Sequence, residues 1–208
     1  MRSTSQGLAW TAVLFAVALA LACWFVSITA HADAPPQHFA WARAALSRIP
    51  ASRADREPER TELRAANLDA FAQEIARVSE RAPLPPHQWA SLLGAIGGIE
   101  SNFDTDIVAG RCPAWACDHG RAKGAFQGQR LRFVAQLWDV ANDNPPAQVQ
   151  MADRVLRRNW SRCAPFAPFP ASAFRGYGGQ RSCSWPAPRE AERVAMYSRL
   201  LATQETSR

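Results

Sequence analysis

Glu100 is the carboxylic acid whose place in this sequence best suits acid–base chemistry. Apolar residues at three- and four-residue steps predict a helix over residues 86–100, and Leu93, Ile96 and Glu100 lie on one face of it. Polar residues 101–104 break the period, so we expect the helix to end at Glu100. A carboxyl group on an apolar face is partly removed from water, which favours its neutral form and suits a general acid. The alternative is that Glu100 only satisfies backbone groups at a helix end.

Two other residues have side chains suited to a carbohydrate. Gln127 follows closely on a glycine in the segment Gly124–Gln127, where the backbone can approach a ligand and the amide can both donate and accept hydrogen bonds. Six tryptophans remain after residue 32, and Trp115, in a loop with two cysteines, is the best candidate to stack on a sugar ring. A place in the hydrophobic core is the alternative for Trp115.

Three short motifs resemble those of the lysozyme-like lytic transglycosylases, a superfamily that includes goose-type lysozymes. Residues 100–104 (ESNFD) resemble its E-S-x-F/G segment, and residues 123–127 (KGAFQ) look like its G-L-M-Q or G-x-W-Q motif. Residues 174–179 (FRGYGG) look like its A-Y-N-A-G motif and place Tyr177 at the tyrosine. The resemblance covers roughly residues 86–200, with the motifs in the family's order. Three positions of the last motif depart from the family pattern: Arg175, Gly176 and Gly178.

The resemblance implies a glycosidase that acts on peptidoglycan, at the β-1,4 bond between N-acetylmuramic acid and N-acetylglucosamine. Glu100 would protonate the leaving oxygen and then act as a base on the muramyl 6-hydroxyl or on water. Ser101 would orient this acid, Gln127 and Tyr177 would hold the sugar or its N-acetyl group, and no cofactor is implied. The rival function is a non-catalytic peptidoglycan-binding or envelope-assembly protein on the same fold. A lysin of a phage or secretion system would share the chemistry in another setting.

The loop after Glu100 contains further acids that could assist it or bind a cation. A second carboxylate would complete the acid pair found in other glycosidases, and Asp104, Asp106 and Asp118 are the candidates. Their alternative role is hydrogen bonding within the loop. The spacing of Asp104 and Asp106 invites calcium, but the glycine and terminal glutamate of an EF-hand are missing. We therefore expect no metal at this loop.

Four cysteines lie beyond the first segment: Cys112, Cys117, Cys163 and Cys183. An even number in an exported chain predicts disulfides, and three pairings can form. We favour Cys112–Cys117 and Cys163–Cys183, because each bond closes a local loop. Zinc binding by Cys112, Cys117 and His119 is the alternative, although the C-x₂-C pairs of common zinc modules are missing.

Residues 1–32 are typical of an export segment. An uncharged apolar run over residues 8–30 follows Arg2, and an A-x-A pattern occupies residues 30–32. We favour a signal peptide cleaved before Asp33. The run is also long enough to cross a bilayer, so a retained membrane anchor is the alternative. In both cases we expect the rest of the chain in the periplasm, in the cell envelope or outside the cell.

The charge of the exported part suits an anionic envelope polymer or a membrane surface. Arg2 is the only charged residue among the first 32, so 23 basic and 18 acidic residues remain, a formal charge of +5. No compact run of basic residues occurs, which argues against nucleic acid as a partner. The expected partners are peptidoglycan glycan strands, with the membrane for an anchored form and envelope or secretion-system proteins for an assembled one.

Helical periodicity dominates the chain after the export segment, and no run alternates long enough to predict a strand. Six segments have the apolar period of a helix: residues 38–49, 59–80, 86–100, 130–142, 144–160 and 187–204. We expect a mostly α fold, with a single lysozyme-like helical domain and disulfide-stabilised loops. Residues 33–85 are expected to form an N-terminal helical extension and residues 86–208 the catalytic domain. Whether the extension belongs to the catalytic unit is left open by the sequence.

Overall fold

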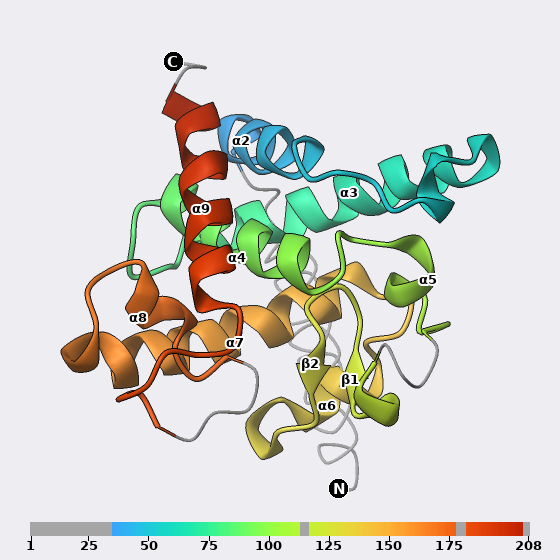
Figure 1. The fold of residues 1–208 in the computed structure, drawn as a ribbon. Coiled ribbons are helices and arrows are strands. Elements are labelled where there is room, and N and C mark those ends of the chain that lie inside the picture. Colours follow the sequence, from blue (N-terminus) through green and yellow to red (C-terminus); the bar gives the residue numbers. More distant parts are fainter. Residues whose placement is uncertain (1–34, 113–116, 178–181, 206–208) are drawn as a thin grey trace, which may run out of the picture. The chain divides into compact units, whose positions relative to one another are not determined.

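A computed structural model of the chain describes residues 35–112, 117–177 and 182–205. Within these residues the fold is mostly helical, as expected (Figure 1). The α-helices are α2 (Pro36–Ser47), α3 (Pro58–Ser79), α4 (Pro86–Glu100), α5 (Thr105–Val108), α6 (Ala135–Asp139), α7 (Pro145–Cys163), α8 (Ala171–Phe174) and α9 (Glu190–Glu205). The 3-10 helices are η1 (Ala54–Arg56), η2 (Asp118–Gly120), η3 (Arg132–Val134) and η4 (Ala164–Phe166). The strands are β1 (Ala122–Lys123) and β2 (Gly128–Gln129).

Proline marks the start of most of the long helices. Helices α2, α3, α4 and α7 each begin with one: Pro36, Pro58, Pro86 and Pro145. Proline suits a first helical position because its missing N–H would have no partner there and its φ is already helical. At α7, Oδ1 of Asn144 also accepts a hydrogen bond from the N–H of Ala147 (3.1 Å). The structure confirms five of the six predicted helices, with ends that differ by a few residues.

The single helix predicted over residues 130–142 is wrong. The segment folds instead into η3 and the short α6, because the backbone of Val134 (φ −128°, ψ 9°) leaves the helical range between them. Val134 packs with Ala141 and Met151 in a small second core. The Nε2 of Gln148 donates to the carbonyl of Ala141 (2.7 Å) just beyond α6. These tertiary contacts outweigh the local helical period.

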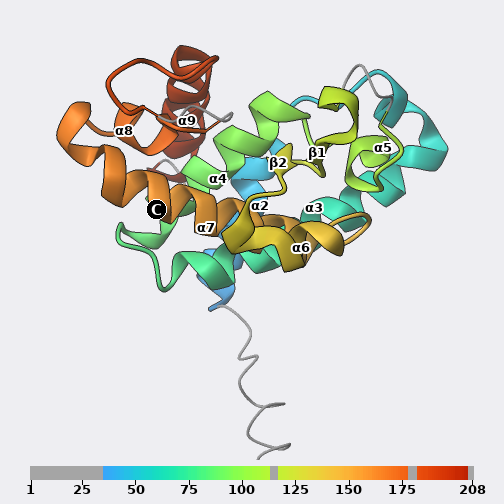
Figure 2. The ribbon, with the colours of Figure 1, turned by 90° about the horizontal axis from the view of Figure 1, so that it is seen from below.

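Helix α4 carries Glu100 and is central to the core that positions this residue. Residues 89–98 of α4 are all buried, and the helix packs against α2, α3 and α9 (Figures 1 and 2). Leu46 of α2 and Phe71 of α3 are buried in the same core. Residues 34–208 form one compact unit, so the expected extension belongs to the same unit as Glu100.

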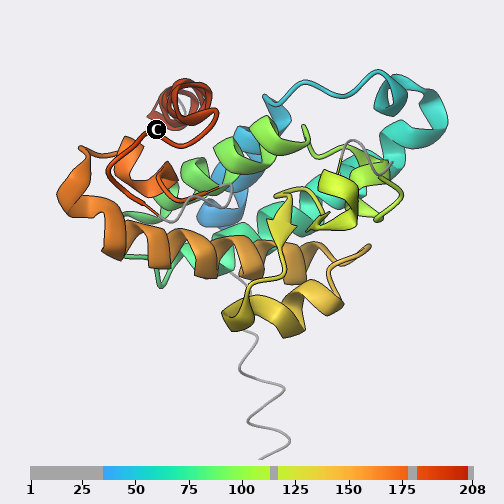
Figure 3. The same ribbon diagram turned by 60° about the horizontal axis from the view of Figure 1, so that its bottom comes forward.

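A small hairpin follows the loop after α4. Strands β1 and β2 pair antiparallel, with Lys123 opposite Gly128, so residues 124–127 form the turn. Figure 3 shows the hairpin above α6, and Nε1 of Trp138 in α6 donates to the carbonyl of Gly128 (3.1 Å). Strands of two residues are too short to leave an alternating pattern, which explains why the sequence predicts none.

Both favoured disulfides are confirmed. Cys112 and Cys117 are bonded, and Cys163 at the end of α7 is bonded to Cys183 before α9. The zinc alternative is wrong, because Cys112 and Cys117 are bonded to each other rather than present as thiolates. Two disulfides indicate an oxidising compartment of the kind that exported proteins encounter.

The predicted export segment, residues 1–32, lies outside the described residues. Of the helices in the described part of the chain, none combines the length and the apolar character that a membrane crossing needs.

Candidate active site

Glu100 ends α4, as predicted, and its carboxylate meets Arg193 of α9. The Nε of Arg193 donates to Oε1 of Glu100 (3.1 Å), and Nη2 of the same guanidinium donates to the same oxygen. The Arg193 side chain is only 3% exposed, and that of Glu100 is 16% exposed. Oε2 of Glu100 accepts no hydrogen bond from the residues that the structure describes. One carboxylate oxygen is therefore held by a buried cation, while the other is available.

The surroundings of Glu100 differ from the apolar ones that its helix face predicts. Ile96 and Phe103 are fully buried, as expected. However, α9 also places the guanidinium of Arg193 against the carboxylate. The apolar residues of the helix face are therefore only part of the surroundings of Glu100, and a neutral acid at this position stays a prediction. Arg193 lies 93 residues from Glu100 along the chain, so no local pattern could pair them.

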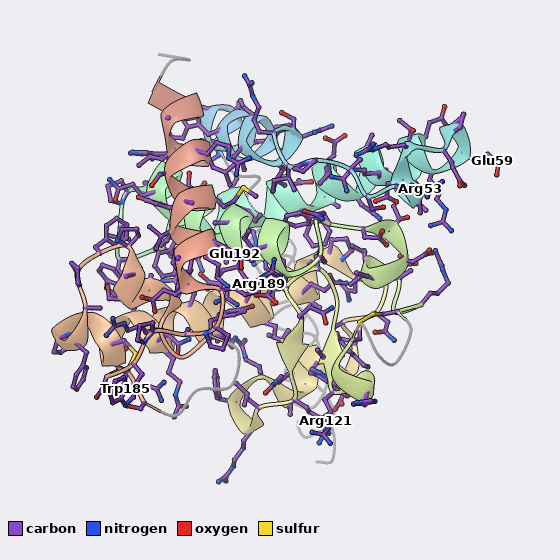
Figure 4. All side chains as sticks on the ribbon, in the orientation of Figure 1. Arg53, Glu59, Arg121, Trp185, Arg189 and Glu192 are labelled. Carbon is purple, nitrogen blue, oxygen red and sulfur yellow. A yellow bond between two sulfur atoms is a disulfide. The ribbon has the colours of Figure 1, made fainter. Side chains whose placement is uncertain are left out.

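A second contact fixes the start of α9 against the end of α4. Arg189 donates from Nη1 to the carbonyl of Ile99 (2.5 Å), next to Glu100. The same guanidinium pairs with Glu192 one turn along α9 (2.9 Å), and Figure 4 shows both residues beside the end of α4. This contact helps to fix the position of α9, and so of Arg193, relative to Glu100.

Tyr177 lies beside the ion pair. Its ring centroid is 5.4 Å from the guanidinium of Arg193, and its hydroxyl donates to the carbonyl of Phe126 (2.9 Å). Burial raises the pKa of the Tyr177 hydroxyl, and the negative charge of Glu100 raises it further. Tyr177 therefore stays protonated and links the Glu100–Arg193 pair to the hairpin turn.

Ser101 links the end of α4 to the same turn. Its hydroxyl lies 2.7 Å from the carbonyl of Ala125 and 3.2 Å from that of Gly97, and it accepts a hydrogen bond from the N–H of Phe103 (3.0 Å). These partners are all backbone groups, so Ser101 orients the turn rather than the carboxylate of Glu100. Its expected contact with a sugar stays a prediction.

Gln127 lies at the end of the hairpin turn, in a left-handed backbone conformation (φ 47°). Its Nε2 donates to the carbonyl of Gly124 (3.0 Å), which holds the side chain across the turn. Gly124 has a φ of 70°, and a Cβ there would lie 2.4 Å from the side chain of Gln148, so only glycine fits. Gln148 in turn accepts a hydrogen bond from the N–H of Ala125 (2.7 Å). The turn is therefore rigidly held from α7, and the sugar contact expected of Gln127 stays a prediction.

Three phenylalanines pack together and connect the segment after Glu100 to the hairpin turn. Phe103 follows Glu100, Phe126 lies in the turn and Phe71 comes from α3; their centroids lie 4.9–5.9 Å apart with edge-to-face geometry. A Cβ at Gly97 of α4 would lie 2.2 Å from the Phe103 ring, so glycine at this position allows the ring to pack. Two of the three rings belong to the resemblance motifs, where their packing role is separate from any contact with a ligand.

Arg64 and Asp55 hold the loop after Glu100, and the sequence analysis missed both. Arg64 donates from Nη1 to the carbonyls of Asn102 (2.7 Å) and Phe103 (2.9 Å). Asp55 pairs with Arg64 (3.3 Å) and accepts from the hydroxyl of Thr105 (2.6 Å). The signal was an arginine on the apolar face of the helix over residues 58–79, four residues before a buried leucine.

The two described acids of the loop have structural partners. Oδ1 of Asp104 accepts from the N–H groups of Asp106 (2.9 Å) and Ile107 (3.3 Å) and caps α5. Asp106 pairs with Arg60 (2.6 Å) and Arg111 (3.0 Å), and the hydrogen bond from Arg60 is the main reason that its pKa is lowered. Asp104 thus makes the loop hydrogen bonds of its alternative role, whereas Asp106 forms ion pairs. A part in catalysis stays a prediction for both acids. Trp115 and the side chain of Asp118 lie outside the described residues.

The convergence at the end of α4 can support acid–base chemistry. It combines a carboxylate with one available oxygen, a buried guanidinium and a neutral phenol. In the part of the chain that the structure describes, no group of three or more His, Cys, Asp or Glu side chains could hold a metal ion.

The chain was compared with protein-family models, with curated proteins and with solved structures. No family model matches it. No curated protein matches it either. No solved structure matches it. Its function is therefore proposed from its own sequence and structure.

Proposed function

We propose that this protein cleaves peptidoglycan glycan strands at the β-1,4 bond between N-acetylmuramic acid and N-acetylglucosamine, as a lytic transglycosylase or a lysozyme-type muramidase. One observation carries the proposal: three segments far apart in the sequence meet at the catalytic candidate. The hydroxyl of Ser101, next to Glu100, reaches the carbonyl of Ala125, and the hydroxyl of Tyr177 reaches that of Phe126. These are the three segments that resemble the motifs of the lysozyme-like lytic transglycosylases.

Glu100 is the general acid and then the general base in this proposal. Its protonated carboxyl gives a proton to the glycosidic oxygen as the bond from that oxygen to the muramyl carbon breaks. The resulting carboxylate then takes a proton from the muramyl 6-hydroxyl or from water as that oxygen bonds to the same carbon. The first nucleophile yields a 1,6-anhydro product, and the second yields a reducing end.

Arg193 supports the acid in this proposal. Its guanidinium stabilises the carboxylate that forms when Glu100 gives up its proton. The contact with Arg193 occupies Oε1, so Oε2 is the oxygen from which the proton would pass to the substrate.

The proposed setting is the cell envelope. The two disulfides agree with export, and the formal charge of +5 after residue 32 suits an anionic polymer. Anchoring through residues 1–32 and contact with envelope or secretion-system proteins belong to the same proposal.

The test is digestion of purified murein sacculi, with the released muropeptides identified by mass spectrometry. The parent protein should release fragments with muramyl ends, and the mass of each end separates an anhydro product from a hydrolysed one. Glu100→Gln should release none above background. Glu62→Gln removes an exposed carboxylate of α3, and it should leave release unchanged.

A non-catalytic peptidoglycan-binding or envelope-assembly protein is the second candidate. The Arg193–Glu100 pair favours it, because a carboxylate bonded to a buried guanidinium can serve as a structural ion pair, as Asp55 and Arg64 do. This candidate predicts that the parent and Glu100→Gln bind sacculi equally and that neither releases muropeptides.

A further inference from the structure

Arginine dominates a cleft where the end of α3 meets α7. The cleft has a volume of about 360 Å³, which lies in the range that small ligands occupy. Its walls include four arginines: Arg77, Arg81, Arg154 and Arg157. Asp153 is the one acid among its described lining residues. A solvent-open cleft with this composition has a strongly positive potential.

One wall of the cleft is built from a fixed arginine. Arg157 donates to Asp153 (2.8 Å) and to the carbonyls of Val78 (2.8 Å) and Arg81 (2.5 Å). Asp153 also accepts from the indole of Trp89 (2.7 Å). All three guanidinium nitrogens of Arg157 are thus engaged, so this residue shapes the wall and holds Asp153.

The other acid near the cleft is also occupied. Both oxygens of Glu74 accept from the guanidinium of Arg77, and one of them also accepts from Nε2 of Gln150 (2.8 Å). This fork-to-fork contact leaves Nη1 of Arg77 free of described partners while its orientation is fixed.

Arg81 and Arg154 complete the cleft without any such partner. Both are exposed, and neither side chain makes a hydrogen bond or ion pair with another residue in the described ranges. Four guanidinium groups therefore face the carboxylates of Asp153 and Glu74, and the charge of Glu80 also acts on Arg77. At least one positive charge is unbalanced, and an anionic ligand would offset it.

We propose that this cleft binds the phosphate group of an organic ligand. A phosphate ester carries one or two negative charges near neutral pH, and its oxygens match the planar fork of arginine. The volume of 360 Å³ is more than a bare phosphate would fill, so the cleft has room for an organic part of the ligand. Arg81, Arg154 and the free Nη1 of Arg77 are the donors.

The cleft is separate from the candidate active site. Trp89, which holds Asp153, and Glu100 lie at opposite ends of α4. They are eleven residue steps apart, which corresponds to about 16 Å along the helix axis. The proposal therefore does not depend on Glu100, and Glu100→Gln should bind the ligand like the parent.

The test measures binding of inorganic pyrophosphate by calorimetry, and of phosphatidylcholine vesicles with and without phosphatidylglycerol by flotation. The variant is Arg81→Gln with Arg154→Gln. Its control is Arg121→Gln with Arg132→Gln, which removes the same charge from exposed residues elsewhere (Arg121 is labelled in Figure 4). Each lost contact to a phosphate should weaken binding about tenfold, and the control should bind like the parent.

The two arms separate the sources of the phosphate. Binding of pyrophosphate alone would indicate a soluble phosphorylated ligand, and binding of only the vesicles that contain phosphatidylglycerol would indicate a lipid headgroup. Either result supports the proposal when Arg81→Gln with Arg154→Gln loses it. No binding to either probe, equal loss in both double variants, or binding of citrate in preference to pyrophosphate would overturn it.

Discussion

Two arginine–carboxylate pairs flank the loop that follows α4, and they differ in how fully their atoms are used. Arg64 and Asp55 are 7% and 0% exposed at their side chains. Arg64 also donates to three backbone carbonyls, and Asp55 also accepts from the backbone and hydroxyl of Thr105. In the other pair, Glu100 uses only Oε1 toward Arg193.

The difference separates a structural pair from a reactive one. A buried charge pair is tolerated where hydrogen bonds satisfy the remaining lone pairs and protons, as they do at Asp55 and Arg64. Glu100 keeps a partly exposed carboxylate with an unengaged oxygen. We infer that the first pair holds the loop, while the second leaves an acid ready to meet a substrate.

The largest expected effect is on turnover in Glu100→Gln. This change keeps the shape of the side chain and removes its transferable proton, so murein release should fall by roughly 10²–10⁴-fold. Circular dichroism should show an unchanged fold. Glu62→Gln, which changes an exposed carboxylate of α3, is the control. Turnover of Glu100→Gln within about threefold of the parent would place the acid elsewhere and remove the contrast between the pairs.

The largest expected effect on stability is in Arg64→Met. Removing one partner of a buried pair leaves Asp55 charged and uncompensated, so the free energy of unfolding should fall by about 3–5 kcal/mol. Urea denaturation measures this change. Arg60→Met, on the same helix as Arg64, breaks the more exposed pair with Asp106 and should lower the free energy of unfolding much less. Equal losses in the two variants would contradict the structural role of Arg64.

The disulfides are expected to have the next largest effect on the free energy of unfolding, and the longer loop should give the larger loss. Replacing Cys163 and Cys183 by alanine opens a loop of 20 residues and should cost about 3 kcal/mol. Replacing Cys112 and Cys117 opens a loop of 5 residues and should cost about 2 kcal/mol. The exported protein should contain no reactive thiol in a labelling assay. A larger loss at the shorter loop would show that this bond has a further role in the hairpin region.

The smallest expected effect distinguishes Arg193 from Arg64. In Arg193→Met the carboxylate of Glu100 can turn to water, so the free energy of unfolding should fall by only about 1 kcal/mol. Turnover should fall on the order of tenfold, because the carboxylate formed in the reaction loses its cation. Folded protein with a turnover equal to the parent's would mean that Arg193 contributes to stability alone.

Much of the scaffold could be predicted from the sequence because its signals are local. The apolar period of a helix and the effect of a proline such as Pro58 or Pro86 involve only residues within one or two turns. These signals predicted the positions of α3 and α4. The end of α4 at Glu100 follows from the same kind of pattern. The pairing of Cys163 with Cys183 follows from a short loop.

The environment of Glu100 was decided by the tertiary structure. Arg193 and Tyr177 lie near this acid although they are 93 and 77 residues away along the chain. The apolar period of α9 does not predict which of its turns packs against α4. The break in the helix predicted over residues 130–142 has the same origin. Val134 packs with Ala141 and Met151, and Gln148 of α7 donates a hydrogen bond to the carbonyl of Ala141. Periodicity records which face of a helix is buried, whereas the partner on that face is selected by packing across the whole chain.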